Sequence, residues 1–257
     1  LEDYSTEMNF SAAKLARSVA DKFTDKNPDK IRFVAGAIGP TNKTASISPK
    51  VDDPAYRNVS FDELKDVYKE SAISLIDGGV DFLILETIFD TLNAKAGIFA
   101  VGEINQKRSH KVPLMISGTI TDFSGRNLSG QTVEAFWNSV RHAEPLSIGL
   151  NCSFGAERLT PAVEELSRVA DTNILAYPNA GLPNPMGEYD ETPDTTASYI
   201  AEWAKNGIIN IVGGCCGTTP EHIKKIYEQV SLYSPRVIPK IEKTIKLSGL
   251  EPFGVIS

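Results

Sequence analysis

Three cysteines are the residues of this chain whose types and positions could do chemistry. Cys215 and Cys216 are adjacent, follow a strand-like apolar run, and are flanked by glycines at positions 213, 214 and 217. Cys152 ends a second strand-like run, residues 146–152. Because α/β barrels place their chemistry at the carboxyl ends of the strands, we expect the three thiols to gather at one rim.

Three convergent thiols would suit a zinc ion whose fourth position is open. Zinc prefers thiolate and imidazole ligands, and a catalytic zinc keeps one position for water or substrate. A free thiol, with a pKa near ~8.5, is mostly protonated at neutral pH. A substrate thiol in the open position would lose its proton, because metal-coordinated thiols are deprotonated. The pattern therefore predicts a site that turns a thiol into a sulfur nucleophile.

The cysteines alone leave other interpretations open. Adjacent cysteines lack the CxxC form, and successive side chains of an ideal strand point to opposite faces, although the flanking glycines permit a turn that could bring both sulfurs inward. Free cysteine is often an inert core residue. The glycines and threonines of residues 213–219 could instead form a phosphate-binding turn at a helix N-terminus, and redox exchange is a further alternative.

Three other polar residues stand at the ends of strand-like runs, namely Glu86, Asn151 and Asn179. A carboxylate at the end of a buried strand needs a partner, so Glu86 makes either an internal salt bridge or a contact with a substrate ammonium group. The two asparagines could orient polar substrate atoms, or could fill capping and turn roles. We expect structural or solvated roles rather than metal ligation for His110, His142 and His222.

The composition is that of an ordinary globular protein. Of the 257 residues, 41% are hydrophobic and 23% charged, which is enough apolar sequence for one domain of barrel size. The net charge of -7 and the lack of a basic stripe argue against a nucleic-acid partner and a membrane-surface role. No run approaches the ~18 apolar residues of a membrane span. Three cysteines are too few for a disulfide framework, so we expect a reducing, cytoplasmic location.

Strand-like runs alternate with amphipathic stretches, the pattern of βαβ units. We expect helices after each of six strands, which lie near residues 31–37, 81–86, 113–118, 146–152, 173–177 and 208–213. Ser60 and Glu63 match a capping box that opens one helix, and Thr219 with Pro220 opens another. The chain itself begins on a helix. The pattern therefore predicts most of a (β/α)8 TIM-type barrel, here incomplete, with its first two strands absent. Either the chain is a truncated piece of such a barrel, or the fold is open.

Longer motifs resemble the homocysteine-binding domain of cobalamin-dependent methionine synthase, a member of the homocysteine S-methyltransferase family. The motifs are Phe33–Asn42, Leu85–Thr91, Ser117–Ile120, Gly149–Cys152, Tyr177–Asn184 and Gly213–Gly217. In the tail, Leu247–Pro252 resembles the family's link toward a folate domain. The resemblance implies a barrel domain over residues 1–234, truncated at its N-terminus, and an extended linker over residues 235–257 that leads toward a following domain.

The resemblance also implies a zinc-dependent methyltransferase. The family's three zinc-binding cysteines match Cys152, Cys215 and Cys216, and homocysteine, as a zinc-bound thiolate, attacks the methyl group of methylcobalamin to give methionine. The glutamate that resembles Glu86 is expected to hold the substrate's amino group, and Asn151 and Asn179 are candidates for further substrate contacts. Methylcobalamin and methyltetrahydrofolate would be bound by separate cobalamin and folate domains of the same polypeptide, not by this chain.

Other functions stay open at this point. One is a stand-alone homocysteine methyltransferase that takes its methyl group from a small sulfonium or betaine donor, which the terminal linker disfavours. Another is a non-catalytic module that binds zinc or docks neighbouring domains. A barrel enzyme that binds phosphate at residues 213–219 is a more distant alternative.

Overall fold

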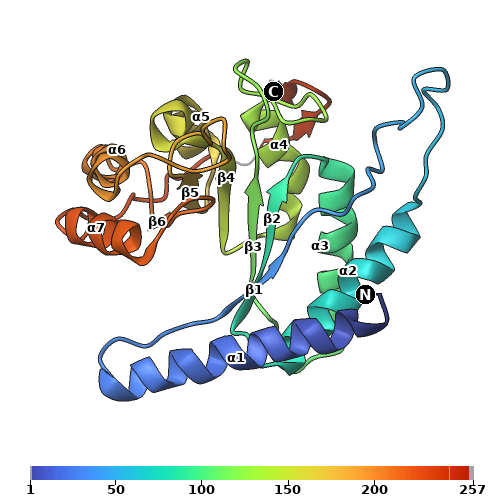
Figure 1. Cartoon of the computed structure of the whole chain (residues 1–257). Coiled ribbons are helices and arrows are strands. Elements are labelled where there is room, and N and C mark those ends of the chain that lie inside the picture. Colours follow the sequence, from blue (N-terminus) through green and yellow to red (C-terminus); the bar gives the residue numbers. More distant parts are fainter. Residues whose placement is uncertain (1, 243, 255–257) are drawn as a thin grey trace. The chain divides into compact units, whose positions relative to one another are not determined.

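The computed structural model describes residues 2–242 and 244–254 and has an α/β architecture (Figure 1). Six strands form one sheet. They are β1 (Ala35–Ile38), β2 (Phe82–Ile88), β3 (Leu114–Gly118), β4 (Ser147–Gly155), β5 (Asn173–Asn179) and β6 (Ile211–Val212). Their order in the sheet is β1-β2-β3-β4-β5-β6. The pairs β1–β2, β4–β5 and β5–β6 are parallel. The six predicted strands are confirmed, and their order follows the chain, as in a TIM-type barrel. Closure of the barrel stays a prediction.

Helices connect the strands. They are α1 (Ser5–Lys26), α2 (Phe61–Asp77), α3 (Thr91–Gln106), α4 (Val133–Val140), α5 (Ala156–Val169), α6 (Pro193–Lys205) and α7 (Pro220–Val230), with short 3-10 turns η1 (Glu2–Tyr4) and η2 (Arg141–Ala143). A helix follows every strand of the sheet, so the expected βα alternation is confirmed. Among the described residues, no helix is both long and apolar enough to cross a bilayer.

Local signals set the helix starts as the sequence predicts. Ser60 Oγ accepts a hydrogen bond from the Glu63 amide at 3.2 Å, and Glu63 Oε2 accepts one from the Ser60 amide at 2.7 Å, which completes a capping box. Pro220 occupies the first turn of α7, where its missing N–H has no intrahelical acceptor to lose. Such caps satisfy the first amides of each helix and fix where the preceding loop ends.

The chain divides into two compact units, Leu1–Glu86 with Leu92–Met115, and Thr87–Thr91 with Ile116–Ser257. In the first unit, α1 packs on α2, and α2 packs on β1. Its interior is formed by buried side chains of α2 and β2, among them Leu64, Tyr68, Leu75, Leu83 and Leu85. Glu86 is the last residue of the first chain segment of this unit.

The second unit contains all three cysteines. In it, α5 packs on β4 and β5, while α6 packs on α5 and α7. The first five residues of β4 are all buried, as expected for a strand of a parallel sheet that is covered on both faces. Trp203 is fully buried, and its indole N–H donates to Thr160 Oγ1 at 2.8 Å, which fixes α6 against α5.

The tail after α7 folds back onto the second unit. Arg236 is buried, and its guanidinium group donates to carbonyl oxygens at the end of α5. Further on, β7 (Lys246–Ser248) and β8 (Pro252–Gly254) form an antiparallel hairpin that packs on α4. Part of the stretch predicted as a linker, residues 235–257, is therefore a docked hairpin, and its connection to a following domain stays a prediction.

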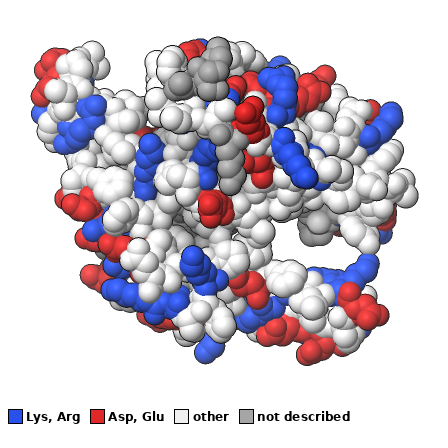
Figure 2. Space-filling view, turned by 180° about the vertical axis from the view of Figure 1, so that it is seen from behind, with Lys and Arg blue, Asp and Glu red and all other residues white. Residues whose placement is uncertain are grey.

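Charged side chains of both signs are interspersed on the face drawn in Figure 2. This mixed pattern agrees with the modest net charge of -7.

Candidate metal centre

The sulfur atoms of the three cysteines lie together at the carboxyl ends of β4 and β6. The Sγ atoms of Cys152 and Cys216 are 3.8 Å apart, those of Cys215 and Cys216 are 3.9 Å apart, and all three lie within 4.8 Å of one another. Cys152 and Cys215 are half-buried and Cys216 is exposed, so the cluster opens to solvent on one side. The expected convergence of the three thiols is confirmed.

A break in the strand geometry of β4 aims Cys152 at the cluster. The pairing of β4 with β5 shifts register between Asn151 and Gly155, and Cys152 and Ser153 have φ angles of 62° and 60°. Left-handed backbone at non-glycine residues costs roughly 1–3 kcal/mol each and persists only where the surroundings fix it. Here the distortion turns the Cys152 side chain out of the strand's alternation.

A tight turn after β6 brings Cys215 and Cys216 to the same place. Two glycines make this turn possible: a Cβ on Gly214 would lie 2.3 Å from Thr218 Cγ2, and Gly217 has a φ of 79° and lies against the Tyr189 ring. The Cys215 carbonyl accepts from the Thr218 amide at 3.2 Å, which closes the turn. The prediction that glycines let both sulfurs point inward is confirmed.

The turn is anchored on the end of β5. The Cys215 amide donates to the Pro178 carbonyl at 2.8 Å, and the Cys216 carbonyl accepts from the Ala180 amide at 2.9 Å. The buried Asn179 side chain adds a third bond, since its Oδ1 accepts from the Cys216 amide at 3.1 Å. Asn179 thus orients the cysteine backbone, and its predicted contact with substrate stays a prediction.

Asn151 is fully buried and links the cluster to the last residues of β2. Its Oδ1 accepts from the Thr87 amide at 3.0 Å and from the Ser117 hydroxyl at 2.7 Å. Its Nδ2 donates to Thr87 Oγ1 at 2.8 Å and lies 3.9 Å from Cys215 Sγ. Thr87 has a φ of 55°, so this pairing also fixes a strained residue. The amide is engaged on every side within the protein, and its predicted contact with substrate stays a prediction.

Glu86 is half-exposed at the end of β2, directly before Thr87, and belongs to the first unit. Its predicted role toward a substrate amino group stays a prediction. Of the histidines, His222 is buried, with Nδ1 accepting from the Thr219 amide at 3.2 Å and Nε2 bonded to the Glu191 carbonyl at 3.0 Å. Both ring nitrogens of His222 are therefore used within the fold.

The surroundings of the Cys215 thiol disfavour its charged form. Burial first, and then the neighbouring Cys152 and Cys216, raise the pKa of Cys215 to about 12, against a smaller lowering by Asn151. Tyr189, from the loop after β5, borders the cluster, and its pKa is raised by burial first and then by Cys216. Tyr189 was not singled out from the sequence.

The sulfur positions fit the ligand geometry of zinc. A tetrahedral zinc with Zn–S bonds of about 2.3 Å requires sulfur atoms about 3.8 Å apart. The two measured S–S distances, 3.8 and 3.9 Å, match this edge. Three thiolates that repel one another would be stabilised by a divalent cation, and Asn151 Nδ2 supplies a donor toward one sulfur, as outer partners of metal ligands commonly do.

Comparisons with known proteins agree with this picture. The family described as "Homocysteine S-methyltransferase" matches residues 1–230. Among solved structures, the apo form of the homocysteine methyltransferase MmuM from Escherichia coli is similar, with a TM-score of 0.70 and 20% identity over 89% of this chain and 76% of that one. Its metallated form has a TM-score of 0.69 and 20% identity over 87% and 70% of the two chains. At this identity the structural likeness establishes the fold.

Proposed function

This chain belongs to the homocysteine S-methyltransferase family, and on that premise we propose that it is a zinc-dependent module that methylates homocysteine to give methionine. The observation that carries the proposal is the triangle of sulfur atoms, with two edges of 3.8 and 3.9 Å and an exposed face. We assign the metal to Cys152, Cys215 and Cys216. When bound, zinc would act as a Lewis acid that lowers the pKa of the substrate thiol.

The residues of the chain would hold the substrate and the ligand set in place. Glu86 is proposed to pair with the ammonium group of homocysteine, because a carboxylate is the natural partner of a cationic amine. Asn179 and Asn151 are proposed to act mainly on the ligands, since the first fixes the Cys216 amide and the second approaches Cys215 Sγ. Their direct contact with homocysteine is a further part of the proposal.

The reaction forms one bond and breaks one. A lone pair of the homocysteine sulfur forms the new S–CH3 bond, the bond between the methyl group and its donor breaks with its electron pair left on the donor, and the thiol proton passes to solvent. We propose methylcobalamin, bound by a separate domain of the same polypeptide, as the donor. The motif likeness of the tail to a link toward a folate domain favours this assignment over a small donor.

A second candidate donor is a small sulfonium or betaine compound, used by a stand-alone enzyme. The structural likeness to MmuM, a homocysteine methyltransferase, keeps this candidate in view. The two are separated by incubating the zinc-loaded chain and homocysteine with methylcobalamin, with a methylsulfonium donor, or with betaine, and measuring methionine. Methionine from a small donor alone would overturn the cobalamin assignment, and a zinc-loaded chain that makes no methionine from any donor would favour a non-catalytic module.

The metal assignment is tested by substitution. We expect about one zinc per chain, and loss of zinc on Cys152→Ala, Cys215→Ala or Cys216→Ala, because each change removes one of three ligands. The chain has no fourth cysteine, so Ser231→Ala, an exposed change at the end of α7, serves as the control. Zinc content follows from elemental analysis after dialysis. Full zinc content in the triple alanine variant would contradict the assignment.

A further inference from the structure

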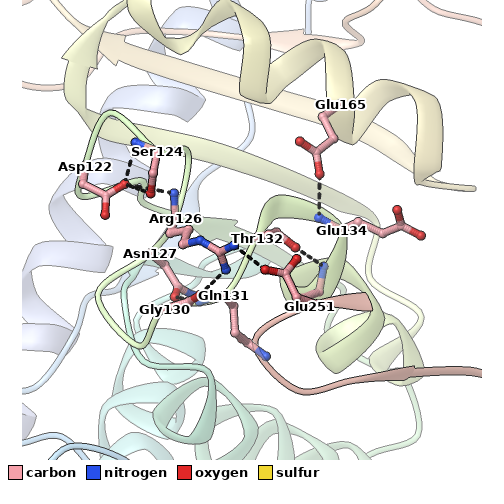
Figure 3. A network of polar contacts seen from close by, with 11 residues as sticks. Asp122, Ser124, Arg126, Asn127, Gly130, Gln131, Thr132, Glu134, Glu165 and Glu251 are labelled. Carbon is pink, nitrogen blue, oxygen red and sulfur yellow. Dashed lines mark hydrogen bonds and ion pairs between the residues drawn. The ribbon is translucent and has the colours of Figure 1, made fainter. Parts of the chain in front are cut away.

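The hairpin β7–β8 is docked onto the loop between β3 and α4, residues 119–132, here called the rim loop. Its turn presents main-chain carbonyls to this loop: Leu250 O accepts from the Thr132 amide at 3.1 Å, and Gly249 O accepts from Gln131 Nε2 at 2.8 Å. Figure 3 shows Arg126 of the rim loop and Glu251 of the turn pointing toward one another as an ion pair. Three kinds of contact therefore fix the hairpin to one loop.

Gln131 is the residue on which these contacts meet. Its side-chain Oε1 accepts a hydrogen bond from the Thr91 hydroxyl, while its Nε2 donates to Gly249 O and to Ser139 Oγ, the latter at 3.1 Å. Its main chain pairs with Asn127, whose Oδ1 accepts from the Gln131 amide at 2.9 Å. The amide group of Gln131 thus joins the tail, α4 and the segment Thr87–Thr91.

The rim loop in turn holds the segment 87–91 and the end of β4. The Ser129 amide donates to the Phe89 carbonyl at 3.1 Å, and the Thr119 amide donates to the Ile88 carbonyl at 2.9 Å. The Thr119 hydroxyl bonds to Ser153 Oγ at 2.8 Å, one residue after Cys152. At the other end of the segment, Thr87 bonds to Asn151, which lies beside Cys215.

We propose that the docked hairpin holds the rim in its substrate-binding arrangement, with Gln131 and the Arg126–Glu251 ion pair as positioning residues. The inference rests on the proposed function for the identity of the bound molecule, homocysteine. A strained Thr87 needs surroundings that fix it, and the rim loop supplies them from one side while Asn151 supplies them from the other. The hairpin is the last element of the described chain. A change at this end of the chain that released the hairpin would therefore also loosen the rim loop.

The test uses the full chain with zinc bound and the variant Gln131→Glu. A glutamate keeps an oxygen for the Thr91 hydroxyl but turns a second oxygen toward Gly249 O, so the contact with the hairpin becomes repulsive. We expect the homocysteine concentration for half-saturation to rise about tenfold, with zinc content and the maximal rate unchanged. The control is Gln106→Glu, the same change at an exposed position at the end of α3, which should leave half-saturation unaltered.

A charge-reversal cycle gives a second test that a loss of folding cannot mimic. Arg126→Glu and Glu251→Arg each place like charges together, and we expect each to raise half-saturation about threefold, in keeping with a partly exposed pair. The double variant restores the attraction but not the bond from Arg126 to the Gly130 carbonyl, so half-saturation should return most of the way to the wild-type value. Wild-type half-saturation in Gln131→Glu and in both single variants would overturn the proposal, as would a double variant worse than either single one.

Amide hydrogen exchange separates failure of this inference from failure of the proposed function. In Gln131→Glu we expect faster exchange at the Thr87, Thr119 and Ser129 amides. Exchange at the Gly213 and Cys215 amides, which bond to carbonyls of β5, should not change. If the wild-type chain does not bind homocysteine, the proposed function fails, and exchange alone decides whether the hairpin orders the rim. Unchanged exchange at all three rim amides would overturn the ordering role.

Discussion

Replacing Asn151 by aspartate should weaken zinc binding without removing a ligand. The two side chains have the same shape, so the carboxylate can still accept from the Thr87 amide and the Ser117 hydroxyl. The change falls on Nδ2, which lies 3.9 Å from Cys215 Sγ. In the variant an anionic oxygen takes the place of this donor beside the sulfur.

The size of the effect follows from that distance. Two unit negative charges 3.9 Å apart repel by roughly 4 kcal/mol at an effective dielectric constant of about 20. The positive charge of zinc offsets part of this repulsion, because the carboxylate is also drawn toward the metal. Loss of an outer hydrogen-bond partner typically weakens metal binding by about 10- to 100-fold. We therefore expect a loss of about 100-fold in zinc affinity, which corresponds to about 2.7 kcal/mol.

Competition with a chromophoric chelator at fixed pH and ionic strength measures this affinity. The control is Asn173→Asp, the same change at the first residue of β5, which is the end of that strand away from the cysteines. There the side-chain amide donates to the Leu146 carbonyl. Thermal unfolding of the metal-free variants checks that both fold. A folded Asn151→Asp chain whose zinc affinity equals that of the control would refute the reasoning, because it would show that the contact with Cys215 has no bearing on the metal.

Three further predictions concern the substrate, the tail and a helix start. Glu86→Gln should raise half-saturation by homocysteine about 10- to 100-fold with zinc content unchanged, as expected for loss of one charged hydrogen bond; titration calorimetry would measure it. Arg236→Met should lower the free energy of unfolding by about 2–5 kcal/mol in urea titrations, since it leaves the Ser167, Ala170 and Thr172 carbonyls, now bonded at 2.6–2.9 Å, without donors. Ser60→Ala should cost about 1 kcal/mol at pH 7. The Ser60 amide is the first cause that lowers the pKa of Glu63 and the Ser60 hydroxyl the second, and the substitution removes only the hydroxyl. The stabilisation from the hydroxyl is present above the ordinary value of 4.5 and is lost as pH falls below that, so a stability difference that is the same at pH 3 and pH 7 would contradict this origin.

The sequence allowed prediction of the elements and of the cysteine cluster because both depend on local signals. Apolar runs bounded by glycine or polar residues mark the strands, and the Ser60–Glu63 box marks a helix start that the structure reproduces. Cys152, Cys215 and Cys216 could be singled out because each follows such a run. The carboxyl ends of parallel strands lie at one edge of the sheet, so residue position along the chain was enough to predict their convergence.

Other parts of the site depend on contacts between distant residues and leave no local pattern. Thr87 adopts left-handed backbone because Asn151, far along the chain, bonds to both its amide and its hydroxyl. Tyr189 borders the cysteines only because the loop after β5 folds over Gly217. The hairpin strands β7 and β8 have three residues each, too few to show an alternation, so the tail looked like an extended linker.

The sheet order explains why the turn that carries Cys215 and Cys216 has to be rich in glycine. β5 lies between β4, which carries Cys152, and β6, which leads to Cys215. Neighbouring strands are about 4.8 Å apart, so β4 and β6 are separated by about 10 Å, whereas the Cys152 and Cys216 sulfurs are 3.8 Å apart. The chain must therefore end β6 early and cross over the end of β5. The length of β6, only two residues, agrees with this. Bonds from the turn to Pro178 and Ala180 hold it there. A bulky residue at position 214, where even an added Cβ would lie 2.3 Å from Thr218 Cγ2, would push the turn away from β4 and open the sulfur triangle.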